Sequence, residues 1–172
     1  MARYGATIVS QTQQLAGVNS TTTVNGYMGY IGGSATAGFR LRRLQFGVMT
    51  TSATVPTSQQ ITIGVYRQTV APSGTGIAAS VPGQALETWT PTDPTGGIFA
   101  ITATTIGTTG PTLATNPIIK PTFNSQNTLD LPYEFIEEIV SAIGTANGIA
   151  FVNLQNTLPA NHFIQIAAEW EV

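Results

Sequence analysis

Cysteine is absent from the 172-residue sequence, and histidine occurs once, as His162. Disulfides, thiolate metal sites and cysteine nucleophiles are therefore excluded. Long apolar runs are absent too, because no stretch approaches the ~18 residues of a membrane span. The N-terminal residues lack the basic start and apolar run of a secretory signal. We expect a soluble protein that is made in a cytoplasm and has no membrane partner.

Charge is also scarce. Only 8% of the residues are charged, against about 25% in an ordinary soluble domain. Disorder does not explain this deficit, because disordered chains have low hydrophobicity and high charge, whereas 42% of this chain is hydrophobic and its mean hydropathy is +0.15. One lysine, Lys120, is available to protect strand edges. The pattern indicates a protein whose surface is largely covered by neighbours; the alternative is a threonine-rich β domain with a free surface.

The balance of charge argues against a nucleic-acid partner. The net charge is −2 and the pI is about 5.2, so a broad basic surface is missing. The one basic cluster consists of Arg40, Arg42 and Arg43. Alternation along a strand would put Arg40 and Arg42 on one face and Arg43 on the other, so at most two could share a face.

Short segments rich in Val, Ile, Thr and aromatics recur between turn residues, which is typical of a β-sandwich or barrel. Residues 60–69 place Ile61, Ile63 and Val65 on one face, and residues 40–49 do the same with Leu44, Phe46 and Val48. We predict one domain, residues 1–172, folded as a mostly β, antiparallel β-sandwich of about eight strands, with these two segments as a pair. Further strand candidates are residues 6–10, 15–24 and 97–104.

The C-terminal part predicts an antiparallel hairpin. Residues 148–155 and 162–172 flank a connection that contains Pro159, which cannot continue a ladder. The first arm is apolar on both faces, which indicates a central strand or a strand in a subunit interface. The candidate interface residues are Ala150, Val152 and Leu154.

Two other stretches depart from the strand pattern. Residues 132–143 carry apolar side chains at helical spacing, with Pro132 near the start and Gly144 after the end, and predict one short helix. Residues 70–96 and 105–131 are dense in Pro, Gly and Thr, and predict long loops that serve as contact arms.

Motifs for catalysis are missing. The sequence contains no Gly-x-Ser-x-Gly motif, which would supply a nucleophilic serine for His162 to activate. We interpret His162 as a strand-edge or loop histidine. Glu134, Glu137 and Glu138 indicate a solvated helix face more than a metal site. No dinucleotide or phosphate-loop fingerprint occurs. We therefore expect no enzyme, no cofactor and no metal. Trp89, among prolines and threonines, is a candidate partner contact or a cap on the core.

Three segments carry a family resemblance: FRLRRLQFGV at 39–48, PTSQQITIGVY at 56–66, and GIAFVN at 148–153 with LPANH at 158–162. They resemble β-sandwich virion proteins of tailed bacteriophages, especially those that decorate or cement the capsid. The resemblance implies a jelly-roll-like fold, a homotrimer on the head surface, the major capsid protein or another virion protein as partner, location in the virion, and no enzymatic activity. It transfers no functional residues.

Two classes of function remain open at this stage. In the first, a structural virion protein, the candidate partner contacts are Arg40, Arg42, Arg43 and Trp89. For Arg42, at the rim of the core, the alternative role is an internal ion pair with Glu87, Glu137 or Glu169. In the second class, a carbohydrate-binding or adhesin-like sandwich, the site would use the aromatic residues Trp89, Tyr27, Tyr30 and Tyr133.

Overall fold

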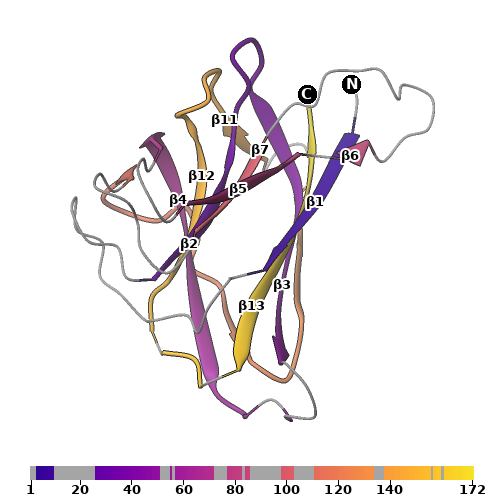
Figure 1. The fold of residues 1–172 in the computed structure, drawn as a ribbon, viewed down its shortest axis with the longest axis vertical. Coiled ribbons are helices and arrows are strands. Elements are labelled where there is room, and N and C mark those ends of the chain that lie inside the picture. Colours follow the sequence, from indigo (N-terminus) through magenta and orange to yellow (C-terminus); the bar gives the residue numbers. More distant parts are fainter. Residues whose placement is uncertain are drawn as a thin grey trace.

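The computed structural model describes residues 3–9, 26–50, 55, 57–71, 77–82, 84–85, 98–102, 111–133, 138–155, 157–159 and 161–172. These residues form two antiparallel sheets that pack face to face (Figure 1). The predicted antiparallel β-sandwich is confirmed. The described part contains thirteen strands, more than the eight expected, because several are only two to four residues long.

The first sheet has the strand order β10-β3-β13-β1-β6, and β11 pairs with β3 as well. Its strands are β1 (Arg3–Val9), β3 (Phe39–Thr50), β6 (Gln84–Ala85), β10 (Leu129–Pro132), β11 (Ile139–Ser141) and β13 (His162–Glu171). The second sheet has the order β5-β7-β2-β12-β4-β8, and β9 also pairs with β4. Its strands are β2 (Tyr27–Gly32), β4 (Gln60–Val70), β5 (Ile77–Pro82), β7 (Ile98–Thr102), β8 (Thr112–Leu113), β9 (Thr122–Asn124) and β12 (Gly148–Asn153).

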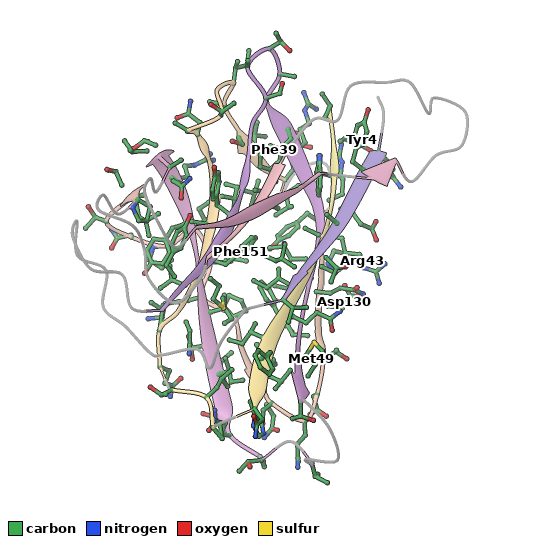
Figure 2. The ribbon with its side chains drawn as sticks, in the orientation of Figure 1. Tyr4, Phe39, Arg43, Met49, Asp130 and Phe151 are labelled. Atoms are coloured by element: carbon green, nitrogen blue, oxygen red, sulfur yellow. The ribbon has the colours of Figure 1, made fainter. Side chains whose placement is uncertain are left out.

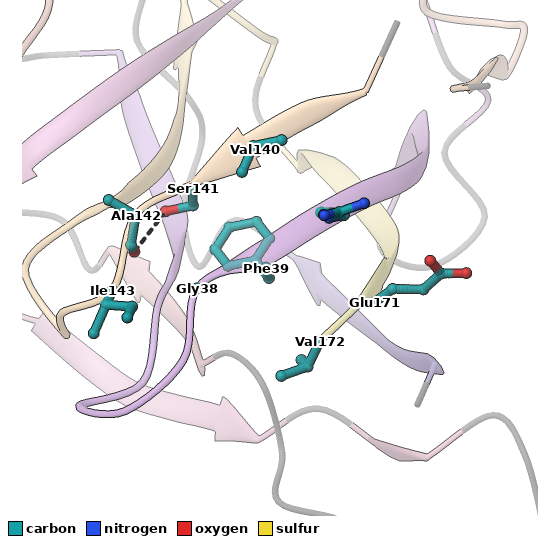
Figure 3. Close-up of a pocket in the computed structure, with 9 residues that line it drawn as sticks. Gly38, Phe39, Val140, Ser141, Ala142, Ile143, Glu171 and Val172 are labelled. Atoms are coloured by element: carbon teal, nitrogen blue, oxygen red, sulfur yellow. Dashed lines mark hydrogen bonds between the residues drawn. The ribbon is translucent and has the colours of Figure 1, made fainter. Parts of the chain in front are cut away.

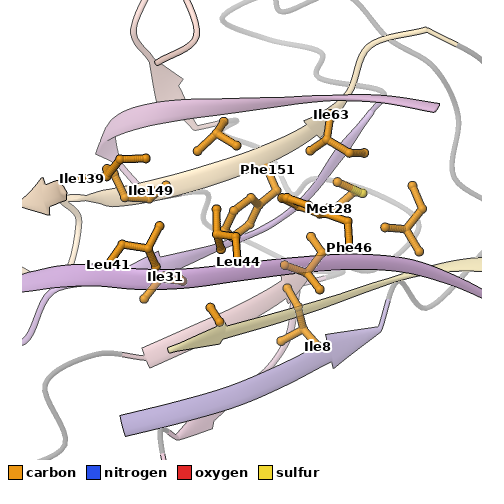
Figure 4. Packing of buried hydrophobic residues seen from close by; sticks show 14 of the residues in the cluster. Ile8, Met28, Ile31, Leu41, Leu44, Phe46, Ile63, Ile139, Ile149 and Phe151 are labelled. Carbon is orange, nitrogen blue, oxygen red and sulfur yellow. The ribbon is translucent and has the colours of Figure 1, made fainter. Parts of the chain in front are cut away.

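The core lies between the two sheets (Figure 4). The ring of Phe46 lies 6.2 Å from that of Phe123 and meets Phe151 edge-on at 6.1 Å, which joins the two sheets through aromatic contacts. The alternation predicted for residues 60–69 is confirmed, since Ile61, Ile63 and Val65 are fully buried. Alternation therefore identified the core face of β4 correctly.

The predicted hairpin is wrong. β12 pairs with β2 and β4 in the second sheet, whereas β13 pairs with β1 and β3 in the first. The connection between them carries Leu158, which is completely buried in the core. Burial of this side chain draws the connection across from one sheet to the other instead of into a tight turn. The predicted pair of residues 40–49 and 60–69 is wrong in the same way, because β3 and β4 belong to different sheets.

The predicted helix at residues 132–143 is also wrong in its described parts. Pro132 ends β10, and Ile139–Ser141 is β11; both strands lie on the same edge of β3. Ile139 and Ser141 are buried and Val140 is exposed, which is the alternation of a strand. The β-branched pair at 139–140 and the open edge of β3 outweigh the helical spacing. Residues 134–137 lie outside the described residues.

The two stretches predicted as long loops contain strands. The first includes β5 and β6, and the second includes β8, β9 and β10. The strand expected at residues 15–24 lies outside the described residues. The strands expected at residues 6–10 and 97–104 are present as β1 and β7 with shifted ends.

Candidate functional site

Charged side chains gather at one place, on the outer face of the first sheet. The cause is a β-bulge in β3: Arg43 pairs with Glu169 of β13, and Leu41 pairs with the next residue, Trp170, so Arg42 is the extra residue. Leu41 and Leu44 both point into the core. The three arginines at 40, 42 and 43 therefore all lie on the outer face, and the expectation that at most two share a face is corrected.

The other neighbour of β3 is interrupted at the same point. Pro132 of β10 pairs with Arg43, and Ile139 of β11 pairs with Leu41, so the strand pairs described on this edge do not include Arg42. Tyr133 closes the gap on one side by donating its backbone N–H to the Arg42 carbonyl at 2.8 Å. The carboxylate of Glu138, the residue before β11, lies next to Arg40 and Arg42.

Arg42 is the centre of the first group of ion pairs. Its side chain is only 8% exposed and contacts Glu138 at 2.9 Å and Glu171 at 2.5 Å. Glu171 also accepts a hydrogen bond from Arg3 at 3.0 Å. Burial would raise the pKa of Glu171, but the hydrogen bonds from Arg42 and Arg3 outweigh this effect and hold the pKa below its usual value. A buried arginine with two carboxylate partners is a structural group.

Arg43 is the centre of the second group of ion pairs, in the part of β3 that pairs with β10. Its Nε and Nη2 atoms donate to the two carboxylate oxygens of Asp130 at 2.8 and 2.7 Å, and Nη1 reaches Glu169 at 3.4 Å. Figure 2 shows Arg43 and Asp130 on the side of the first sheet that faces away from the core. The hydrogen bonds from Arg43 lower the pKa of Asp130 and raise that of Arg43. We call both groups together the charge network, made of Arg3, Arg40, Arg42, Arg43, Asp130, Glu138, Glu169 and Glu171.

The structure shows internal ion pairs for all three arginines predicted as partner contacts, Arg40, Arg42 and Arg43. Their role as partner contacts stays a prediction. Glu169 was expected as an acceptor and is one, although its partner is Arg43. Sequence reasoning missed Glu171, Asp130 and Glu138 as acceptors. Strand pairing of β3 with β13 and β10 would have been needed to find the first two. Glu87, Glu137 and Trp89 lie outside the described residues.

Arg40 differs from the other two arginines of β3. Its side chain is 45% exposed, and its acidic contact is a single, long one of 3.4 Å to Glu138. Arg40 borders a hollow of about 260 Å³ at the paired strands β3 and β11. Figure 3 shows other residues that line it, among them Val140 and Ile143. The exposed side chains of Val140 and Ile143 contribute apolar surface to this hollow.

His162 is part of a buried hydrogen-bond network at the start of β13. Its Nε2 atom accepts the backbone N–H of Thr57 at 3.1 Å, and Ser125 donates its hydroxyl to the carbonyl of Thr57 at 2.5 Å. The Nε2 lone pair is used by a peptide group, so it is not presented to a nucleophile. His162 fits the interpretation of a structural histidine at a strand end.

The predicted interface residues lie on the outer face of the second sheet. Ala150 and Val152 are completely buried there with Tyr27 and Tyr66, while Leu154 is partly buried against this cluster. Because this burial occurs within a single chain, no second subunit is needed to cover Ala150 and Val152. Their role in a subunit interface stays a prediction. The prediction that residues 148–155 form a central strand is confirmed, since β12 lies between β2 and β4.

The tyrosines proposed for a sugar site differ in exposure. Tyr27 is buried and donates its hydroxyl to Gln68 at 2.6 Å. Burial, with a smaller contribution from Tyr30, raises the pKa of Tyr27 well above its usual value. Tyr30 is partly buried against the same cluster, and Tyr133 packs against the core. A buried ring cannot stack on a sugar, so Tyr27 does not fit that role.

The described part of the chain contains no group of three potential metal-ligating side chains. In the same residues, no helix is long and apolar enough to cross a membrane. Glu134 and Glu137, two of the three acidic residues weighed for metal binding, lie outside the described residues, and the third, Glu138, binds arginines.

Comparison with known proteins found no match for this chain among protein-family models, curated proteins or solved structures.

Proposed function

We propose that this protein is a structural virion protein of the capsid decoration or cement type, which attaches to the surface of a phage head and stabilises it. It acts through binding, without a reaction or a cofactor. The sandwich fold and the resemblance of residues 39–48, 56–66 and 148–153 to such proteins support the proposal. A protein of this class would be found in the virion and would bind the major capsid protein or another head protein.

The observation that carries the proposal is the use of charge within the chain. Four of the six basic residues belong to the charge network, in which four arginines meet four carboxylates. Internal pairing leaves little charge to solvate the rest of the surface or to steer charged ligands. Such a surface suits permanent contact with a protein lattice, where uncharged groups can pack or form hydrogen bonds without the cost of desolvating ions.

Exposed apolar side chains are the natural contact points on this surface. The described residues include six large hydrophobic side chains that are exposed: Met49, Val55, Val70, Ile118, Val140 and Ile143. They are distributed over several elements, which fits contact with more than one neighbour. We propose that the neighbours are head subunits and other copies of this chain, with a homotrimer as the assembled form.

The test is attachment to heads that lack this protein, measured by co-sedimentation over a range of salt concentrations, together with the mass of the free protein in solution. We expect attachment that weakens little with salt, because few ion pairs would cross the interface, and a mass of three chains. A monomer that binds glycans and does not attach to heads would contradict the proposal. Attachment that is lost by several orders of magnitude at moderate salt would contradict an uncharged interface.

A further inference from the structure

We propose that the pair Asn147 and Gly148 is a deamidation site, which the folded chain keeps unreactive and which reacts when the start of β12 separates from β2. Asn147 is the last residue of the connection between β11 and β12, and Gly148 begins β12. Asparagine is a thermolabile residue. It reacts most readily before glycine, which has no side chain to shield its backbone nitrogen. The chain has one other Asn-Gly pair, at residues 25 and 26.

Deamidation of this pair needs only water as a co-reactant. The backbone nitrogen of Gly148 loses its proton and attacks the side-chain Cγ of Asn147. The new N–Cγ bond closes a five-membered succinimide ring, while the Cγ–Nδ2 bond breaks and Nδ2 leaves with the proton as ammonia. Water then opens the ring at one of its two carbonyls and gives aspartate or isoaspartate at position 147. The attack therefore requires a Gly148 nitrogen that has left the strand ladder and an Asn147 side chain that can turn toward it.

The fold requires the glycine of this pair. A Cβ at position 148 would lie 2.2 Å from the carbonyl oxygen of Ile31, which is a backbone atom of β2. Gly148 is buried and has strands on both sides, because it pairs with Gly32 of β2 and with Gln68 of β4. A bulkier residue, which would shield the nitrogen from reaction, does not fit at this position.

The fold also uses the amide of Asn147. Its Nδ2 atom donates a hydrogen bond to the carbonyl of Ile143 at 2.7 Å. Its backbone N–H donates to the carbonyl of Gly144 at 3.1 Å, and its own carbonyl accepts the N–H of Gly33 at 2.9 Å. An ionised aspartate has no donor for the Ile143 carbonyl. Both reacting groups are thus held in other contacts, the Asn147 amide by the turn and the Gly148 backbone by the three-stranded ladder.

The reaction would weaken the contacts that prevent it. A carboxylate at position 147 would place an oxygen where Nδ2 now bonds the carbonyl of Ile143, so attraction becomes repulsion. Isoaspartate would also add one CH₂ group to the main chain directly before Gly148, whose position against Ile31 leaves no room for a shift. We therefore expect the product to be less stable than the original chain and the change to persist after the sheet closes again.

The first experiment compares the full chain in the folded state with the same chain unfolded in urea, both kept at mildly alkaline pH. Peptide mapping by mass spectrometry detects the gain of one mass unit and the isoaspartate at each Asn-Gly pair. In urea, Asn147 should react at a rate similar to that of Asn25. In the folded chain it should react about tenfold more slowly or less, because attack must wait for local opening. Equal rates in both states would overturn the protection, and no reaction of Asn147 in urea would overturn the site.

A second experiment opens the site within the folded protein. Gly33→Ala places a Cβ 2.7 Å from the carbonyl oxygen of Ala142 and crowds the two connections that hold Asn147. This variant should deamidate at position 147 about threefold faster or more. The matched control is Gly47→Ala in the first sheet, where the Cβ meets only a methyl group of Thr128 at 3.2 Å; it should react like the original chain. An unchanged rate in folded Gly33→Ala would show that the contact with Gly33 does not protect the site.

The consequence of the reaction is tested by Asn147→Asp, which reproduces one product directly. We expect its urea unfolding midpoint to shift to a lower concentration than that of the original chain, since the donor to the Ile143 carbonyl is lost. Asn127→Asp, at an exposed position before β10, is the control and should unfold like the original chain. The same midpoint for Asn147→Asp and the original chain would contradict the expected weakening of the turn.

Discussion

The outer faces of the two sheets are covered by different means. On the first sheet, the charge network holds β3, β10, β13 and the segment before β11 together through ion pairs. On the second sheet, Tyr27 and Tyr66 pack with Ala150 and Val152, and the Tyr27 hydroxyl donates a hydrogen bond to Gln68 in this buried cluster. One face concentrates the chain's few charges, while the other uses aromatic rings.

The difference shows what each solution requires of the sequence. The aromatic face needs glycine: a Cβ on Gly64 would lie 2.4 Å from the ring of Tyr66, and one on Gly148 would lie 2.2 Å from the carbonyl oxygen of Ile31. The ionic face needs a bulge, because regular alternation would turn one arginine toward the core. A chain with few charges can thus place them together only through a local irregularity.

The largest effect should come from a charge on the aromatic face. Val152→Asp places a carboxylate at a site that is completely buried and has no cation described in its cluster. We expect a loss of about 4 kcal/mol or more in the free energy of unfolding, or failure to fold. Val55→Asp, at a position 76% exposed, is the control and should unfold like the original chain in urea. A folded, stable Val152→Asp protein would show that this face is not part of the structural core.

The stability that the ionic face provides should fall when one carboxylate is removed and when the pH is lowered. Glu171→Gln removes one of the two carboxylates described next to the buried Arg42, and we expect a loss of about 2–3 kcal/mol at neutral pH, below the full cost of an unpaired buried charge. The pKa of Glu171 is lowered in the folded chain. Its contribution is therefore present above the unfolded value of about 4.3 and is lost as the pH falls through the folded value.

Urea unfolding between about pH 7 and pH 3 measures both effects. The original chain should lose stability in the acid part of this range, and Glu171→Gln should lose less because it lacks the titrating group. Parallel curves for the two proteins would contradict a role for Glu171 in acid sensitivity.

Periodicity predicted the class of fold because burial follows alternation: Ile61, Ile63 and Val65 belong to the core as expected. It could not predict which strands pair. The assignment of β12 and β13 to different sheets depends on the buried Leu158 in their connection and on long-range pairing. The helical spacing of residues 132–143 led to a wrong prediction. Ile139–Ser141 forms a strand because it pairs with the edge of β3, and the local sequence does not show that this edge is available.

The candidate site could be predicted only in part. The run of arginines marked the place, and the idea of an internal ion pair included Glu169. The bulge puts all three arginines on one face, but residues 40–43 contain no glycine or proline from which it could be predicted. Without the bulge, the separate roles of the buried Arg42 and the exposed Arg40 could not be assigned.

A smaller effect is expected from the hydrogen bond between Tyr27 and Gln68 on the aromatic face. Tyr27→Phe removes the hydroxyl that donates to Gln68 at 2.6 Å and leaves the Gln68 carbonyl oxygen in a buried site. We expect a loss of about 1–2 kcal/mol, measured by urea unfolding. Tyr27→Phe combined with Gln68→Met should recover part of this loss, since methionine removes the unsatisfied Gln68 oxygen, while the Ala146 carbonyl loses only a long, 3.4 Å contact with Gln68 Nε2. No recovery in the double variant would mean that Tyr27 stabilises the face by another contact.

The smallest effect should come from the exposed part of the charge network. Asp130→Asn removes the bidentate partner of Arg43, whose side chain is 40% exposed and which also contacts Glu169. Water and salt screen such a pair, so the loss of stability should be much smaller than for Glu171→Gln and should vanish in about 1 M NaCl. The lowered pKa of Asp130 predicts that the remaining difference also disappears as the pH falls through the folded value, because protonation ends the pair in the original chain. Thermal unfolding at low and high salt measures both. A loss as large as that of Glu171→Gln, or one that persists in high salt, would show that the two groups of the network act as a single buried unit.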